Sequence, residues 1–389
     1  MNRNTVFVVA LFMCATILPS LAKEPFIVES EATTFQIEQV VSGLKIPWAL
    51  TFLPDGLALV SERYTGRISV LDVSSGKISQ IEDGPDDVFI KDNGGMLDVI
   101  LHPNYVNNGW IYYSYSAGTQ ELNTTVVERA RLQENRFIDR ERIFAALPWF
   151  HNSIVYGCRL AFKDGYLFVT TGDRWDLRHL SQSTGSHLGK IMRLNDDGSA
   201  PADNPYVNIP GAMPEIWSIG VRNAQGLTVH PETGALWEHE HGPLGGDEVN
   251  IIKAGANYGW PVISYGKEYT GEPIGQGLTE RDLRRHGHYS SKNIQRPIHT
   301  YIPSIAPSDM IFYTGDKFPA WYGNLFIGAM SLHHLNRLVI KGETVVHEER
   351  LFADKGWRVR LVEQGPDGFL YIGVDDGMIL RLVPAEITP

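Results

Sequence analysis

Short runs in which apolar residues alternate with polar ones, or in which β-branched residues follow one another, recur along most of the chain. Gly, Pro, Asp and Asn separate these runs, as they do where turns join strands. No 18-residue stretch after the N-terminal segment has the apolar spacing of an amphipathic helix. The pattern therefore predicts a chain made mostly of β-strands.

One phrase, an apolar strand followed by a turn and a second apolar strand, returns six times. Its copies occupy residues 50–60, 99–113, 160–169, 227–237, 310–327 and 362–372. In the first copy the turn is Pro54-Asp55-Gly56, where Pro presets φ, Asp caps the turn through its side chain and Gly accepts a positive φ. We therefore expect each copy to be a β-hairpin.

Six evenly repeated hairpins predict a six-bladed β-propeller of four-stranded antiparallel blades. Such a ring removes most exposed sheet edges by closing on itself. A β-sandwich is the competing architecture, but its hairpins would not be expected to repeat one turn phrase so evenly. Because no linker or low-complexity stretch interrupts the chain, residues 23–389 are expected to form a single domain.

The first 22 residues have the pattern of a secretory signal peptide. Arg3 supplies the basic start, an apolar run extends from Val6 to Leu18, and the small residues Ser20 and Ala22 precede the expected cleavage point. The run is shorter than the roughly 20 residues that a membrane span requires. The alternative is a buried N-terminal strand or helix. The signal predicts a periplasmic or secreted protein without a membrane span.

Removal of this segment leaves a single cysteine, Cys158, so an intramolecular disulfide is excluded and stability must come from the core. The formal charge of −11 argues against a nucleic-acid partner, which would require a basic face. One local exception is the stretch 269–297, interpreted as a solvated basic loop or, alternatively, as a docking site for an acceptor protein. Its basic residues are Arg281, Arg284, Arg285, His286, His288 and Lys292.

Three groups of motifs carry a resemblance to a known family. They are Gly220-Val-Arg-Asn-Ala-Gln-Gly-Leu227, the segment His239-Glu-His-Gly-Pro243 with Gly245-Gly-Asp-Glu248 and its continuation to Pro261, and Arg358-Val-Arg360 before Gly365-Pro-Asp-Gly368. In this order they resemble the soluble and periplasmic aldose sugar dehydrogenases that depend on pyrroloquinoline quinone (PQQ). The resemblance covers nearly the whole chain after residue 22.

The resemblance implies cofactor-binding residues. PQQ is a planar quinone with three carboxylates, and guanidinium groups bind carboxylates in a bidentate and permanently charged way. Arg222 and Asn223 match the family's cofactor-contacting pair, and Arg358 and Arg360 match its Arg-x-Arg pair. Asn93 stands where the family usually carries a quinone-contacting Gln. The alternative for each arginine is a structural ion pair.

The resemblance also implies calcium, a hard cation that prefers oxygen ligands. Gly242 and Pro243 match the family's carbonyl donors to an ion that clamps PQQ, although a plain Gly-Pro turn would have the same sequence. Glu248 and Tyr258 match a second calcium site, with the tyrosine acting through its carbonyl oxygen. Asp247 could equally cap a loop.

The family's proton acceptor is a histidine in a His-x-Gly-x-Arg-Leu segment, and here that segment reads Val155-Tyr-Gly-Cys-Arg-Leu160. Valine cannot accept a proton, so the catalytic residue is unknown from sequence. His151 lies four residues earlier, beyond easy reach at a rise of about 3.3 Å per residue. His187 and Asp98 are further candidates. Three further positions differ from the family's pattern: Leu244 stands in place of a basic residue, Ser331 in place of a lysine and Leu361 in place of an acidic residue.

These features favour an oxidoreductase that binds PQQ and calcium, oxidises an aldose or a related alcohol and passes electrons to an unidentified acceptor. A propeller that binds calcium and PQQ or a sugar without turnover is the alternative that Val155 raises. A third possibility is a lactonase-like hydrolase in which calcium activates water. Trp175, Trp237 and Trp321 could stack on a sugar, although large aromatics in propellers more often fill the blade cores.

Overall fold

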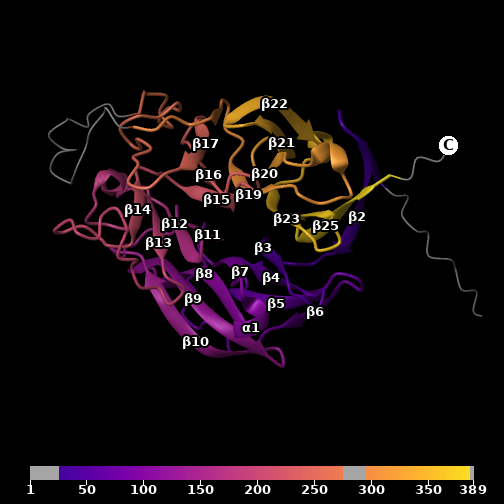
Figure 1. Ribbon diagram of the computed structural model, residues 1–389, viewed down its shortest axis with the longest axis horizontal. Coiled ribbons are helices and arrows are strands. Elements are labelled where there is room, and N and C mark those ends of the chain that lie inside the picture. Colours follow the sequence, from indigo (N-terminus) through magenta and orange to yellow (C-terminus); the bar gives the residue numbers. More distant parts are fainter. Residues whose placement is uncertain (1–25, 275–293, 386–389) are drawn as a thin grey trace, which may run out of the picture.

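The computed structural model describes residues 26–274 and 294–385, and within them the strands form six antiparallel sheets around a common axis (Figure 1). The protein is a six-bladed β-propeller, as the repeated hairpins predict. Each sheet runs from the axis to the rim, so the apolar core is formed between the faces of neighbouring blades. The predicted signal segment, residues 1–22, lies outside the described residues, as do the six basic residues of the stretch 269–297.

Five blades consist of four consecutive strands. The first two contain β3 (Pro47–Phe52), β4 (Ala58–Glu62), β5 (Arg67–Asp72) and β6 (Lys77–Gln80), then β7 (Met96–Leu101), β8 (Trp110–Gly118), β9 (Asn123–Gln133) and β10 (Arg136–Ala145). The next two contain β11 (Gly157–Lys163), β12 (Tyr166–Thr171), β13 (Lys190–Leu194) and β14 (Ile216–Ile219), then β15 (Ala224–Val229), β16 (Leu236–Glu240), β17 (Asp247–Ile252) and β18 (His299–Tyr301). The fifth contains β19 (Pro307–Phe312), β20 (Leu325–Ala329), β21 (His334–Lys341) and β22 (Thr344–Leu351).

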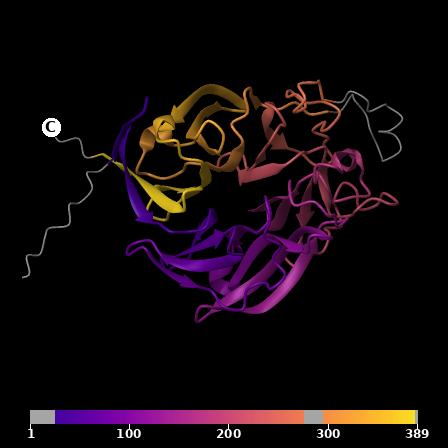
Figure 2. The same ribbon diagram turned by 180° about the vertical axis from the view of Figure 1, so that it is seen from behind.

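The sixth blade is built from both ends of the chain. Its strands are β23 (Val359–Gln364), β24 (Leu370–Val374) and β25 (Met378–Pro384), extended by β2 (Thr34–Val41) and β1 (Phe26–Glu29). β2 pairs with β25 in antiparallel register, and both ribbon views show the indigo N-terminal strand beside the yellow C-terminal one (Figures 1 and 2). Hydrogen bonds between the two chain ends therefore close the ring.

Helices in the described residues are short and lie in the connections. They are α1 (Tyr105–Asn108) and the 3-10 turns η1 (Arg178–Gln182), η3 (Pro319–Trp321) and η4 (Ala353–Lys355). None of them is long and apolar enough to cross a membrane.

The six predicted hairpins are the first two strands of the six blades: β3–β4, β7–β8, β11–β12, β15–β16, β19–β20 and β23–β24. The first strand of each pair lies at the axis (Figure 1). Because every blade begins with its innermost strand, the inner strands run in one direction and their N-terminal ends meet at one end of the axis. We call this end the channel mouth.

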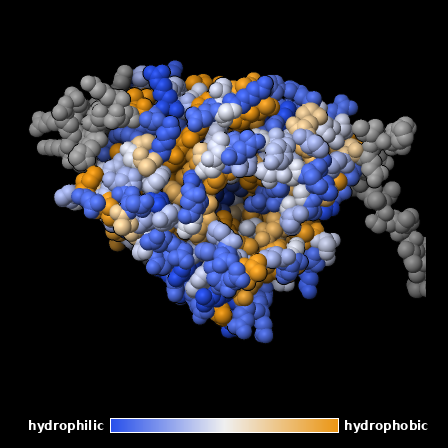
Figure 3. Space-filling view, in the orientation of Figure 1, coloured by the Kyte–Doolittle hydropathy of each residue, from blue (hydrophilic) through white to orange (hydrophobic). Residues whose placement is uncertain are grey.

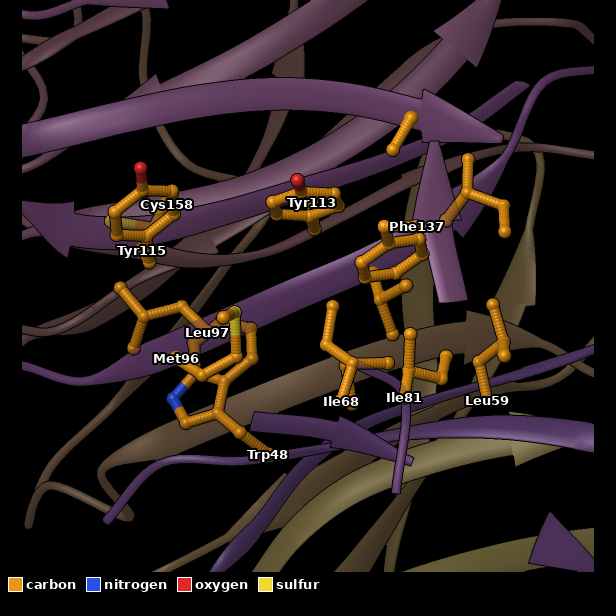
Figure 4. Close-up of a cluster of buried hydrophobic side chains, with 14 of the residues drawn as sticks. Trp48, Leu59, Ile68, Ile81, Met96, Leu97, Tyr113, Tyr115, Phe137 and Cys158 are labelled. Carbon is orange, nitrogen blue, oxygen red and sulfur yellow. The ribbon is translucent and has the colours of Figure 1, made fainter. Parts of the chain in front are cut away.

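Apolar side chains from facing blades form the cores. Between the first two blades, Trp48, Ile68 and Ile81 pack against Met96 and Tyr113 (Figure 4). Cys158 joins the same cluster from the third blade and is a free, buried thiol. The alternation of apolar and polar residues that predicted the strands thus places one face of each sheet against its neighbour.

All six inner strands pair irregularly with the next strand close to their starts. Bulges of this kind turn side chains out of the regular alternation, here toward the axis. Arg159 of β11 lies there between Asp98 of β7, at 3.1 Å, and Asp309 of β19, at 3.3 Å. Its guanidinium also stacks over Trp48 of β3 at 4.1 Å. Charged and aromatic side chains therefore fill the axis beneath the mouth.

Candidate functional site

Three blades place predicted site residues side by side at the channel mouth. Asn93, exposed before β7, accepts a hydrogen bond through Oδ1 from the backbone N–H of Val155, at 3.3 Å. The side-chain Oδ1 of Asn223, before β15, accepts a hydrogen bond from the N–H of Gly157 at 3.0 Å. These contacts fix the loop entering β11, and they bring together residues that are far apart in the sequence.

Arg222 lies beside the loop that follows β16. Its Nη1 donates to the carbonyl oxygens of His241, at 2.8 Å, and Gly242, at 3.0 Å. Its backbone N–H donates to the carboxylate of Glu240. The indole of Trp260 lies against the guanidinium, with 5.2 Å between the ring centroid and Cζ. Arg222 is thus buried and held on both sides.

The second pair of arginines meets at Asp375, which follows β24. Arg360 binds it through two hydrogen bonds of 2.8 Å, and Arg358 donates to it through Nε at 2.9 Å. Burial alone would raise the pKa of Asp375, but the bonds and charges of the two arginines lower it. Arg358 is 47% exposed and Arg360 only 6%, so one guanidinium faces solvent while the other lies beneath it.

Arg222, Arg358 and Arg360 all act on His241. Burial lowers the pKa of this imidazole to about 3, with further lowering by Arg222 and then by Arg360 and Arg358. The imidazole Nε2 lies 2.6 Å from the carbonyl oxygen of Pro307. Three of the predicted cofactor residues therefore converge on one neutral histidine, and the channel mouth carries a concentration of positive charge.

The Gly242-Pro243 loop is pinned by Asp247. The N–H of Gly242 donates to Oδ1 of Asp247 at 2.9 Å, and the N–H groups of Ile305 and Ala306 donate to its Oδ2 at 2.8 and 3.0 Å. Asp247 thus caps the loop. Pro243 is buried and lines a small cavity of about 10 Å³.

A group of buried carboxylates lies behind this loop. Glu240 and Glu248 face each other across β16 and β17, and Asn250 donates to both Glu238, at 2.9 Å, and Glu248, at 3.3 Å. Burial raises the pKa of Glu248 to about 7 and those of Glu238 and Glu240 well above their ordinary range. Oε2 of Glu238 has no hydrogen-bond partner. A group of buried carboxylates of this kind favours either protonation or a cation.

Tyr258 closes the far side of a second cavity of about 10 Å³, which Glu240, Gly242 and Glu248 also line. Its hydroxyl is engaged, since it donates to the carbonyl of Ile251 at 2.7 Å and accepts from the N–H of Lys253 at 2.9 Å. A volume of this size holds about one water-sized sphere. In the residues that the structure describes, no three His, Cys, Asp or Glu side chains converge closely enough to hold a metal ion by themselves.

Val155, which the sequence resemblance matches to the family's histidine, has a backbone φ of 59°. The candidate histidines lie elsewhere. His151 is exposed, with its ring centroid 4.1 Å from that of Phe150 and the two rings tilted by 48°, while His187 lies within hydrogen-bond distance of Glu215 and the N–H of Leu147, at 3.1 Å each. Asp98 is buried in its ion pair with Arg159.

Asp173 is the carboxylate nearest to this position along β12 and its following loop. Its N–H donates to the carbonyl of Arg222 at 2.9 Å, and a Cβ on the preceding Gly172 would lie 2.2 Å from the carbonyl oxygen of Val155. Its carboxylate accepts from Trp260 Nε1 and from the N–H of Trp175, at 2.7 Å each. Burial raises the pKa of Asp173, and the charge of Arg222 opposes that rise.

Sequence reasoning did not find Asp173, Glu240 or Asp375. Glu240 had a signal, because Glu238 and Glu240 alternate on one strand and point to the same face as Glu248. Asp173 and Asp375 follow strands in loops without a distinctive motif, and only the ring closure brings them to the arginines. Of the three tryptophans, Trp237 and Trp321 are buried in blade cores, whereas Trp175 is 40% exposed.

Comparison with known proteins gives evidence on the family that is independent of the site geometry. The profile of the family described as Glucose / Sorbosone dehydrogenase matches residues 44–381. The aldose sugar dehydrogenase YliI of Escherichia coli is 34% identical over 390 residues, which cover 99% of this chain and 100% of that protein. The quinoprotein glucose dehydrogenase B of Acinetobacter calcoaceticus is 27% identical, and the alignment covers 96% of this chain and 94% of that one.

Comparison with solved structures leads to the same family. The crystal structure of the soluble aldose sugar dehydrogenase from Escherichia coli in its apo-form superposes with a TM-score of 0.83 at 36% sequence identity. That superposition covers 90% of this chain and 100% of the crystallised one.

Proposed function

Because the chain belongs to the glucose/sorbosone dehydrogenase family, we propose that it oxidises an aldose sugar or a related alcohol with PQQ and calcium bound at the channel mouth. The observation that carries the proposal is the fixed placement of three arginines, with Arg222 bound to the carbonyls of His241 and Gly242 and with Arg358 and Arg360 bound to Asp375. Permanently charged guanidiniums held in this way suit a rigid polycarboxylate. Figure 3 shows a hollow near the centre of one face of the ring.

PQQ fits these side chains. Arg358, half exposed and fixed by Asp375, and the buried Arg360 and Arg222 would hold its carboxylates. Asn223 and the amide nitrogen of Asn93 would contact its ring carbonyls from either side of the third blade, since their Oδ1 atoms already accept backbone hydrogen bonds. When bound, the quinone supplies the two-electron acceptor for the sugar. The protein's own contribution is to orient it and to take up a proton.

Calcium fits the oxygen donors beside Arg222. The carbonyls of Gly242 and Pro243 would bind one ion, and the Glu248 carboxylate with the Tyr258 carbonyl would bind a second. Two features support this. The Tyr258 hydroxyl is engaged, which leaves its carbonyl as the available ligand, and Oε2 of the buried Glu238 has no hydrogen-bond partner.

For the proton acceptor we propose Asp173. It borders the cavity that Arg222 and Trp260 line, and Val155 beside it cannot take a proton. A carboxylate whose pKa is raised by burial is a better base than an exposed one. In this role Asp173 would accept the hydroxyl proton of the sugar as hydride leaves its carbon.

The test is a titration of the purified apo-protein with PQQ and calcium, followed by the quinone absorbance, and then addition of a panel of aldoses with an artificial electron acceptor. Bleaching by a sugar is expected. Arg358→Ala should weaken PQQ binding by about tenfold or more, because a charge-assisted hydrogen bond is lost. Arg381→Ala is the matched control, since Arg381 pairs with Glu38 on the outer strands. Equal PQQ affinity in both variants would contradict the assignment.

Asp173→Asn tests the base. It keeps the side-chain shape and one acceptor oxygen, enough for one of the two donors Trp260 and Trp175, so PQQ binding should persist while turnover falls by about a hundredfold or more. Unchanged turnover would exclude Asp173.

The calcium site has its own test. In the parent, calcium should raise the thermal unfolding temperature, because the ion binds the folded state alone. Glu248→Gln should reduce that rise, whereas Glu343→Gln in the exposed β21–β22 turn should not. The same calcium response in both variants would remove Glu248 from the site.

Val155 favours one second candidate, a propeller that binds calcium and PQQ or a sugar without turnover. PQQ binding without bleaching by any aldose is its signature in the same titration.

The proposal further includes export: residues 1–22 as a cleaved signal, residues 23–389 as one domain, and a periplasmic or secreted protein that passes electrons to an unidentified acceptor.

A further inference from the structure

An aromatic groove opens beside the candidate site. It is lined by Trp175, Arg178, Glu268, Tyr269, Thr270 and Glu272, and its volume is about 490 Å³. This lies within the roughly 300–1,000 Å³ of small-molecule sites. Trp175 is 40% and Tyr269 59% exposed, and their ring centroids lie 5.4 Å apart with 33° between the planes. Two large rings thus remain open to solvent.

The groove is fixed rather than loose. The backbone of Trp175 has a φ of 60°, and its N–H is held by Asp173 at 2.7 Å. Arg178 and Glu268 form an ion pair of 2.6 Å across the groove, so their planar groups are oriented and their charges offset each other. Rigid aromatic faces beside polar groups suit a neutral ligand that has both C–H faces and hydroxyls.

The groove continues into the candidate site. Trp175, Arg178 and Glu268 line both the groove and the smaller cavity that Asp173, Arg222 and Trp260 complete. A ligand in the groove would therefore extend toward the proposed proton acceptor. The guanidinium of Arg222 itself lies 5.7 Å from the centroid of Trp175.

We propose that this groove is a saccharide subsite that holds the second ring of a substrate, so that the protein prefers reducing di- and trisaccharides to single sugars. The preference for these substrates rests on the proposed function, whereas saccharide binding by the groove does not. Trp175 and Tyr269 stack on the sugar faces, and Arg178 and Glu268 hydrogen-bond its hydroxyls.

Binding is tested on the apo-protein, without PQQ, by isothermal titration with glucose, maltose, cellobiose and their trisaccharides. At least one disaccharide should bind about tenfold more tightly than glucose, as an added aromatic contact allows. Trp175→Ala and Tyr269→Ala should each abolish that difference, and Trp175→Phe should keep most of it. Tyr322→Ala, which removes a similarly exposed tyrosine from the β19–β20 connection, should leave the difference unchanged. Equal affinity for glucose and every oligosaccharide, or no effect of either groove variant, would overturn the proposal.

In the loaded enzyme, the ratio of kcat/KM for the preferred disaccharide to that for glucose should fall about tenfold in Tyr269→Ala but not in Tyr322→Ala. If oligosaccharide binding by the apo-protein depends on Trp175 while no sugar bleaches the quinone, the subsite stands and the proposed oxidation fails. If sugars are oxidised and the ratio of kcat/KM for the disaccharide to that for glucose is the same in the parent, Tyr269→Ala and Tyr322→Ala, the proposed oxidation stands and the subsite is wrong.

Discussion

At Val155 the backbone conformation is unfavourable for the side chain. A β-branched residue with a φ of 59° is an outlier, and such conformations cost about 1–3 kcal/mol. The neighbours enforce it: Gly157 has a φ of 69°, and any Cβ on Gly172 would lie 2.2 Å from the Val155 carbonyl oxygen. Histidine adopts this region several-fold more readily than valine. The loop thus keeps a shape that suits an imidazole better than the side chain it carries.

Val155→His should therefore raise the free energy of unfolding by about 1 kcal/mol and, with PQQ and calcium bound, raise turnover by about a hundredfold or more. The imidazole would lie beside Asp173, which could orient it. Urea unfolding and the dye-linked assay measure the two effects. Val155→Ala is the control, because it removes the β-branch without adding a base and should leave turnover unchanged. A stable Val155→His protein without added turnover would show that the absent imidazole does not limit turnover.

Among the elements, β2 has a special place because it pairs on the outer side of β25, in a blade whose three inner strands come from the opposite end of the chain. Phe35 on β2 is fully buried, with its ring centroid 5.3 Å from that of Trp321 and 6.5 Å from that of Phe352. This strand therefore attaches the start of the described chain to the fifth and sixth blades by both hydrogen bonds and aromatic packing.

Phe35→Ala should lower the free energy of unfolding by about 3–5 kcal/mol, because a large cavity would open where the ring closes. Urea or thermal unfolding measures the loss. Ile27→Ala on β1, where the side chain is 59% exposed, should change stability by less than about 0.5 kcal/mol. Similar losses in the two variants would mean that β2 does not hold the ring closed.

At the scale of the whole molecule, three acidic side chains of the described residues, Asp98, Asp309 and Glu363, lie around Arg159 at the axis. Burial raises the pKa of Asp309 to about 7, with Arg159 lowering it and Asp98 raising it. Burial and the charge of Asp309 raise the pKa of Glu363 to about 8 from an ordinary value of 4.5. The folded protein therefore binds protons here that the unfolded chain has released, and the six blades together create this environment.

Because the folded pKa of Glu363 lies above its unfolded value, its contribution to stability is complete below about pH 4.5 and is lost as the pH rises through about 8. Glu363→Gln should match the parent near pH 4.5 and become more stable than the parent above pH 8. Urea unfolding at pH 5, 7 and 9 measures the difference. Glu343→Gln, in an exposed turn, should follow the parent throughout. A difference that does not vary with pH would remove Glu363 from this cluster.

The sequence by itself determined the propeller, because strand alternation and the turn chemistry of Pro54-Asp55-Gly56 act within a few residues. It also predicted Arg222, Arg358 and the Gly242 loop as site residues, since each belongs to a short contiguous motif. It could not find Asp375 beneath the arginines, Asp173 beside Val155, or the groove that Trp175 forms with Tyr269. Those juxtapositions join residues from different loops and blades. Only closure of the ring decides their distances, because no local pattern in the chain encodes how two distant loops meet.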